Sequence, residues 1–173
     1  MKKNVPDYLT LAESQLRSSS LRTTDARLKV LAALLGARHA LSHQDVQDMF
    51  QDMDRVTLYR TLDGLTEAGL AHKISGDDRV FRYNAGIEEQ DAHGHTHHQH
   101  GHFKCTQCAK VFCIDDLDDK LFTTEMESQK GSATTLRQKL QKILQDTLGK
   151  GFQSHEIELT IKGRCAECAS PRK

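Results

Sequence analysis

Two Cys-x-x-Cys motifs are the residues of this chain whose types and spacing best suit chemistry. They are Cys105 with Cys108, past the middle of the chain, and Cys165 with Cys168, close to its end. Four thiolates can hold one zinc ion tetrahedrally at Zn–S distances of about 2.3 Å, with no position left for a substrate. We therefore expect a structural zinc that ties distant segments together. The alternative is a set of ordinary buried thiols.

A second group of metal donors surrounds the first motif. His100 and His102 are two positions apart, so in a strand both imidazoles lie on one face. Cys113 follows within the same short stretch. These three residues predict a second, more exchangeable metal site. The alternative is a polar hairpin surface with an ordinary core cysteine.

We expect no enzymatic activity. A thioredoxin-like redox pair is the enzymatic alternative for Cys105 and Cys108, but the sequence before Cys105 lacks the βαβ pattern of such a centre. The sequence also contains no recognisable Ser-His-Asp set and no glycine-rich phosphate loop.

Composition limits the partners of the 173-residue chain. Its 24 Lys and Arg residues equal its 24 Asp and Glu residues, so any nucleic-acid binding must rest on a local face. The sequence has no run of 18 apolar residues and no apolar core of a signal peptide at its start. We expect a cytoplasmic protein without a membrane partner, in which thiols stay reduced and suit metal sites better than disulfides.

The first part of the chain predicts three helices. The first begins near Pro6, the second runs from a cap at Thr24 to a stop at Gly36, and the third opens at a Ser42–Asp45 capping box. Helical spacing predicts the buried residues of the second and third helices: Leu28, Leu31, Leu35, Val46, Met49 and Phe50.

A fourth helix is predicted between Asp54, as its cap, and Gly69, as its stop. Its apolar side carries Leu58, Leu62 and Leu65, and its opposite side carries Val56, Tyr59, Arg60 and Asp63. An exposed Tyr-Arg pair suits a helix that reads a DNA major groove. An ordinary amphipathic surface helix is the alternative.

Two short strands joined at Gly76–Asp78 are expected next. Helices followed by a hairpin are the plan of a winged helix, so we predict a DNA-binding domain over residues 1–84. Acidic residues nearly balance the basic ones in the recognition segment, and we therefore expect a homodimer to be required for DNA binding.

The segment 85–99 is polar and histidine-rich, and it predicts a linker. Residues 100–173 predict a small α/β domain, with strands on both sides of the first cysteine motif, a helix around Leu136–Leu148 and a strand in which Ile157, Leu159 and Ile161 alternate. The expected fold class is thus α+β.

The motifs VTLYRTL, HGHFKCTQCAKVFC and GRCAEC, in this order, resemble those of the ferric uptake regulator (Fur) family of metal-dependent bacterial repressors. The resemblance covers nearly the whole chain. It implies an N-terminal winged helix, a C-terminal dimerisation domain, binding of a double-stranded operator, and corepression by a divalent metal. It also implies DNA contacts from Thr57, Tyr59, Arg60 and Arg22, and structural zinc at the four cysteines.

The second metal site departs from the iron-type pattern of that family. Gly101 stands where iron-type members have an aspartate, and Cys113 and Arg82 stand at or near glutamate positions. A thiolate in place of oxygen donors favours zinc. We therefore predict a zinc-uptake-type regulator, with an iron- or peroxide-responsive member as the alternative and Fe(II) as the alternative regulatory metal.

The resemblance also implies a ligand from the DNA-binding domain. His39 and His43 bracket the expected position, and we favour His43. The linker histidines His93, His95, His97 and His98 are a further source of donors, or they bind metal only loosely. Extra residues lie between Phe122 and Leu136, and the sequence predicts no role for them. A zinc-buffering or metal-delivery protein is the alternative outside this family.

Overall fold

The computed structural model describes residues 7–76, 78–86, 101–114, 136–153 and 158–170. The chain divides into two compact units, Met1–Thr96 and His97–Lys173. The predicted linker 85–99 falls almost entirely outside the described residues.

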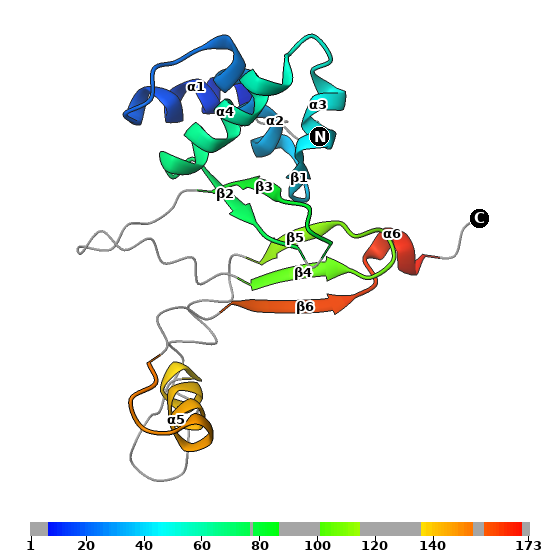
Figure 1. Ribbon diagram of the computed structural model, residues 1–173. Helices are drawn as coiled ribbons and strands as arrows, with labels where there is room; N and C mark the ends of the chain where they lie inside the picture. Colours follow the sequence, from blue (N-terminus) through cyan, green and yellow to red (C-terminus); the bar gives the residue numbers. More distant parts are fainter. Residues whose placement is uncertain (1–6, 77, 87–100, 115–135, 154–157, 171–173) are drawn as a thin grey trace, which may run out of the picture. The chain divides into compact units, whose positions relative to one another are not determined.

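The first unit begins with two capped helices (Figure 1). Helix α1, Tyr8–Ser18, is capped by the Asp7 side chain, which accepts hydrogen bonds from the backbone N–H groups of Leu9 and Thr10. Helix α2, Asp25–Gly36, begins at Thr24, whose hydroxyl accepts from the Arg27 N–H. Both predicted helices are confirmed, because a side-chain oxygen satisfies a helix-end N–H group that has no partner within the helix.

The buried face of α2 differs from the predicted stripe. The fully buried side chains are Val30, Leu31 and Leu34, whereas Leu28 and Leu35 are only partly buried. A helix that is apolar almost all round has no polar side to mark its orientation, so its neighbours decide which side is buried.

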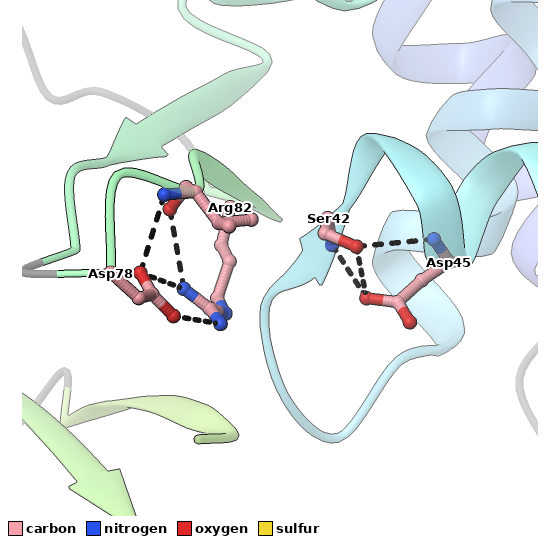
Figure 2. Close-up of polar contacts among 5 residues, drawn as sticks. Ser42, Asp45, Asp78 and Arg82 are labelled. Carbon is pink, nitrogen blue, oxygen red and sulfur yellow. Dashed lines mark hydrogen bonds and ion pairs between the residues drawn. The ribbon is translucent and has the colours of Figure 1, made fainter.

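Helix α3, His43–Met49, opens with the predicted capping box (Figure 2). The Asp45 backbone N–H donates to the Ser42 hydroxyl, and the Ser42 N–H donates to the Asp45 carboxylate. The prediction that Met49 is buried was wrong, since its side chain is 55% exposed. The seven-residue helix ends at Met49 and buries only Val46 fully.

Helix α4, Arg55–Glu67, matches its prediction closely. Asp54 accepts the backbone N–H of Thr57, and Leu58, Leu62 and Leu65 are buried. The helix stops where Gly69 takes a φ of 70°, a left-handed conformation that glycine adopts without steric cost.

A small antiparallel sheet completes this unit. It contains β1 (Leu41–Ser42), β2 (Ala71–Ile74) and β3 (Arg82–Ala85), in the order β1-β3-β2. The predicted hairpin of β2 and β3 is confirmed, while β1 was not predicted because two residues leave no alternating pattern. Together with the four helices, this sheet forms a winged helix (Figure 1).

The helices and the sheet of the first unit share one core. Its fully buried members come from every helix and strand of the unit: Ala12, Leu16, Val30, Leu31, Leu34, Leu41, Val46, Leu58, Leu62, Leu65, Ala71 and Tyr83. This core fixes the backbone of α4 with its opposite side turned to solvent.

An ion pair closes the β2–β3 hairpin (Figure 2). Arg82 Nη2 lies 2.7 Å from Asp78 Oδ2, and Nη1 lies 3.1 Å from Asp78 Oδ1. Arg82 Nη1 also donates to the Val80 carbonyl at 3.2 Å. The Arg82 side chain is 11% exposed and that of Asp78 is 33% exposed, so this fork geometry is largely withdrawn from water.

The second unit contains a three-stranded sheet, β4 (Gly101–Cys105), β5 (Val111–Ile114) and β6 (Leu159–Gly163). Strand β4 is central, antiparallel to β5 and parallel to β6. The strands predicted around the first cysteine motif and before the second are therefore confirmed. Of the three alternating residues predicted for the last strand, Ile157 lies outside the described residues.

The described residues of the second unit include two helices. Helix α5, Leu136–Leu148, was predicted, and it is followed by Gly149 with a φ of 109°. The one-turn helix α6, Ala166–Ala169, begins directly after Cys165, contains Cys168 and was not predicted. Within the described part of the chain, no helix is both long enough and apolar enough to cross a membrane.

Candidate metal centres and nucleic-acid interface

The four cysteines of the two Cys-x-x-Cys motifs converge within the second unit. Their sulfur atoms all lie within 4.8 Å of one another, and Cys108 Sγ is 3.7 Å from Cys165 Sγ. A Zn–S bond of about 2.3 Å places the sulfurs of a tetrahedral site about 3.8 Å apart, so the cluster has the size of a zinc site. All four cysteines are free of disulfide bonds.

Backbone hydrogen bonds shape the two knuckles that carry these sulfurs. The Cys105 N–H donates to the Lys110 carbonyl at 2.9 Å, which closes the first knuckle, and Ala109 at its corner has a φ of 58°. The Thr106 N–H donates to the Gly163 carbonyl at 2.8 Å and joins that knuckle to the end of β6. The parallel pairing of β4 with β6 thus brings together cysteines that are 60 residues apart in sequence.

The surroundings of the sulfurs separate their acidities. Backbone N–H groups, first that of Cys108 and then that of Cys165, lower the pKa of the Cys105 thiol to about 6. The neighbouring Cys165 sulfur, followed by burial, raises the pKa of Cys168 to about 12. Thiols bind a metal as thiolates, so four of them crowd negative charge together. A bound dication would offset that charge. The donor set therefore fits zinc.

The second candidate metal site centres on His102 and Cys113. These residues are direct partners in the antiparallel pairing of β4 with β5. Directly opposite side chains share one face of a sheet, with Cβ atoms about 4.5–5.5 Å apart. The structure thus brings together one nitrogen and one sulfur donor of the predicted site. His100, the third predicted donor of this unit, lies outside the described residues.

The outer face of α4 is the candidate nucleic-acid interface. Tyr59 is 49% exposed, Arg60 and Val56 are exposed beside it, and Thr57 is half-buried. The core leucines on the opposite side of α4 hold these side chains toward solvent. Arg22, the other predicted DNA contact, is exposed before α2, where its carbonyl accepts a hydrogen bond from Arg27 Nη1 at 2.7 Å.

His43 lies between two tyrosines of the first unit. Its ring is stacked on Tyr59 with centroids 4.0 Å apart and meets the edge of Tyr83 at 4.9 Å. His43 Nε2 is 3.4 Å from the Tyr83 hydroxyl. These contacts were not predicted, because the three residues belong to three different elements.

His72, which is only 7% exposed on β2, was not predicted as a site residue. A histidine placed among apolar strand residues was the signal that would have marked it. A neutral imidazole is a metal donor, so His72 joins His43 as a candidate ligand from the first unit.

Comparison with known proteins agrees with the geometry of both units. The sequence profile of the Ferric uptake regulator family matches residues 18–143. The Ferric uptake regulation protein of Haemophilus ducreyi is 29% identical over 125 residues, which are 67% of this chain and 76% of that protein. The transcriptional regulator FurA of Mycobacterium tuberculosis is 32% identical over 119 residues, which are 65% of this chain and 69% of that protein.

Solved structures share the fold at low sequence identity. A zinc uptake regulator complexed with zinc and DNA superposes with a TM-score of 0.58 and 21% identity, covering 96% of both chains. The iron-bound ferric uptake regulator of Francisella tularensis superposes with a TM-score of 0.55 and 16% identity, covering 87% of this chain and 96% of that one. With the profile match over most of its length, these likenesses place the present chain in the Ferric uptake regulator family.

Proposed function

We propose that this protein is a metal-responsive transcriptional repressor that binds a double-stranded DNA operator as a homodimer when a divalent metal occupies a second site. The observation that carries the proposal is the two-faced helix α4. Its leucines are locked into the core of a winged helix, while Tyr59 and Arg60 stand exposed on the other side. The relatives are named as regulators of iron uptake or of transcription.

Each exposed group of α4 has a chemical role on DNA. The Arg60 guanidinium can bind a guanine or a phosphate through two hydrogen bonds, and the Tyr59 ring can contact a thymine methyl group. Thr57 adds a hydroxyl near the start of the helix. Arg22 supplies a positive charge for the adjacent minor groove or the DNA backbone. Together these groups define a small contact surface.

With so small a contact surface, tight binding of DNA requires two copies of the chain. The chain has no net charge, so electrostatic attraction alone gives little affinity for DNA. A twofold dimer doubles the contacts and reads two half-sites. Several large apolar side chains on and near α5 are exposed in the single chain, which supports dimerisation through the second unit: Leu140, Ile143, Leu148 and Phe152.

We propose zinc as the regulatory metal, with His102 and Cys113 among its ligands. Zinc prefers imidazole and thiolate ligands more strongly than iron, manganese or magnesium does. Arg82, near a usual glutamate position of iron-type relatives, is bound to Asp78 within the hairpin and offers no oxygen donor. His100 would be a third ligand, and a histidine from the winged-helix unit, His43 or His72, a fourth.

In this proposal the ligands come from both units, because a metal can bias the arrangement of the two units only when both of them bind it. Metal selects, from the arrangements that the chain samples, the one in which both α4 helices of a dimer reach successive major grooves. Such couplings are typically worth about 1–3 kcal/mol, or about 5- to 150-fold in DNA affinity.

The test is a DNA-binding titration. A duplex is first selected from a random-sequence pool by zinc-loaded wild-type protein, and its dissociation constant is then measured after mild chelation and with zinc, Fe(II) or Mn(II) restored. We expect zinc to strengthen binding and Tyr59→Ala or Arg60→Ala to weaken it, whereas Arg17→Ala, a surface arginine on α1, should have little effect. Equal affinity with and without metal would exclude the switch, and many loosely bound metals without DNA affinity would indicate a zinc-buffering protein.

A further inference from the structure

Three aromatic rings form a continuous row from the core of the winged-helix unit to its outer face. Tyr83 on β3 is 1% exposed, His43 opens α3 and is half-buried, and Tyr59 on α4 is 49% exposed. His43 is the middle ring, 4.9 Å from one tyrosine and 4.0 Å from the other. We define these three residues as the ring row.

The inner end of the ring row is rigid. Tyr83 belongs to the hydrophobic core, and its backbone pairs with Leu41 on β1. Burial, followed by the charge of Asp63, raises the pKa of Tyr83 to about 12, so its hydroxyl keeps its proton and can donate toward His43 Nε2. The interplanar angle of 83° is the favourable edge-to-face arrangement of two rings.

The middle of the ring row is held by its backbone as well. His43 directly follows Ser42, whose capping box with Asp45 fixes the first turn of α3. Burial lowers the pKa of His43, although the charge of Asp63 opposes this and that of Lys73 adds to it. A neutral imidazole can stack on a phenol ring and still accept a hydrogen bond.

The outer end of the ring row is the part that needs support. The core leucines fix the backbone of α4, but an exposed tyrosine still chooses between χ1 rotamers. Of these rotamers, the one in the structure lays one face of Tyr59 on the His43 ring at an interplanar angle of 31°. The remaining half of the Tyr59 surface is open to solvent.

We propose that His43 is a positioning residue for DNA recognition, which holds the Tyr59 side chain in one orientation on the outer face of α4 by stacking on it from the buried side. This inference rests on the proposed DNA-binding function. It gives His43 a role in reading DNA in place of a role as a metal ligand, so that His72 or His39 would be the donor from the winged-helix unit.

The test is a double-mutant cycle on the full-length, zinc-loaded protein with the duplex selected by the wild type. The variants are His43→Ala, which removes the stacked ring, His43→Phe, which keeps a ring without its nitrogens, and Tyr59→Ala, alone and combined with each. A preorganising aromatic contact corresponds to about 2- to 12-fold in affinity per protomer. We expect His43→Ala to lose this factor, His43→Phe to regain most of it, and neither change to matter once Tyr59 is alanine.

A measurement without DNA keeps the inference testable if affinities change for other reasons. The chain has three tyrosines, so ring-labelled tyrosine gives a simple NMR spectrum. We expect the Tyr59 ring signals of the wild type to show the shift of a stacked ring, and those of His43→Ala to move toward rotamer-averaged values. Unchanged Tyr59 signals would overturn the proposal.

The outcomes separate this inference from the proposed function. If His43→Ala weakens DNA binding equally with Tyr59 present or absent, or raises the zinc concentration needed while the cycle stays additive, His43 acts through the fold or the metal and the inference is wrong. In that case the DNA-binding function stands. If the wild type selects no duplex at all, or Tyr59→Ala binds as well as the wild type, the proposed reading helix itself fails and this inference falls with it.

Discussion

His102 and Cys113 face each other directly across the antiparallel strands β4 and β5. The pairing places an imidazole and a thiol on the same side of the sheet within reach of one ion. The two strands are joined through the knuckle of Cys105 and Cys108, and their register sets the spacing of these two donors.

The first prediction concerns Cys113→Ser. Loss of even an outer-shell partner of a metal ligand typically costs about 10–100-fold in affinity, so loss of the ligand itself should raise the zinc concentration for half-maximal DNA binding at least about tenfold. The measurement is a zinc-buffered DNA-binding titration. The variant should retain the zinc of the four-cysteine cluster and its thermal stability; a loss of folding would instead make Cys113 a structural residue.

A second prediction uses the same position to change the metal. Cys113→Glu replaces a soft sulfur with an oxygen donor. The family resemblance implies that iron-type members have a glutamate at this position. Harder oxygen ligands suit Fe(II) and Mn(II) better than thiolate does, so the metal preference should move away from zinc. Titrations with the three ions, run on the wild type and on this variant, compare the order of effectiveness. An unchanged order would show that position 113 does not bind the regulatory metal.

A third prediction concerns the four-cysteine cluster. Cys108→Ser should abolish the tightly held zinc and lower the melting temperature of the second unit, because a bound metal adds a cross-link between two knuckles that backbone hydrogen bonds already bring together. Mass spectrometry under native conditions gives the zinc content, and circular dichroism gives the melting temperature. The matched control is Cys113→Ser, which lies outside this cluster. A Cys108→Ser protein that folds as stably as the wild type without zinc would contradict a structural role.

The fourth prediction concerns the clasp between Arg82 and Asp78. Arg82→Met leaves the Asp78 carboxylate without its fork partner and should reduce local stability by about 1–2 kcal/mol, less than for a fully buried pair because Asp78 is partly hydrated. Hydrogen exchange of peptides covering residues 71–85 measures the effect. Arg79→Met, an exposed arginine of the same hairpin, is the control and should leave exchange nearly unchanged. Equal protection in the two variants would argue against the clasp.

The fifth prediction is a pH dependence at the start of α4. In the folded state, hydrogen bonds from the Thr57 side chain and then from its backbone hold the pKa of Asp54 below its ordinary value of 3.8. The stabilisation is therefore present above the unfolded value and is lost as the pH falls through the folded value. Asp54→Asn keeps a capping oxygen that does not titrate, so its melting temperature should fall less than that of the wild type between about pH 5 and about pH 2.5. Parallel curves would contradict this account.

Much of the fold could be predicted because its signals are local. Thr24, Ser42 and Asp54 cap helices through hydrogen bonds to residues three positions away, and Gly69 ends α4 by its own backbone freedom. The Cys-x-x-Cys spacing likewise specifies metal chemistry without any knowledge of the fold. The helical spacing of the α4 leucines also predicted that Tyr59 and Arg60 lie on the opposite side, and the family resemblance implied that this side contacts DNA.

Tertiary structure decided what depends on residues far apart in sequence. Strand β1 exists only because Leu41 pairs with Tyr83, and Met49 is exposed because α3 ends there. Arg82 turned out to be bound by Asp78, and His43 to lie between Tyr59 and Tyr83. The amino-acid sequence determined the helix ends, the hairpin and the cysteine cluster, since each is written in short-range hydrogen bonds or ligand spacing. Packing alone decided which side chains became neighbours, because contact between distant residues depends on the shape of the whole core.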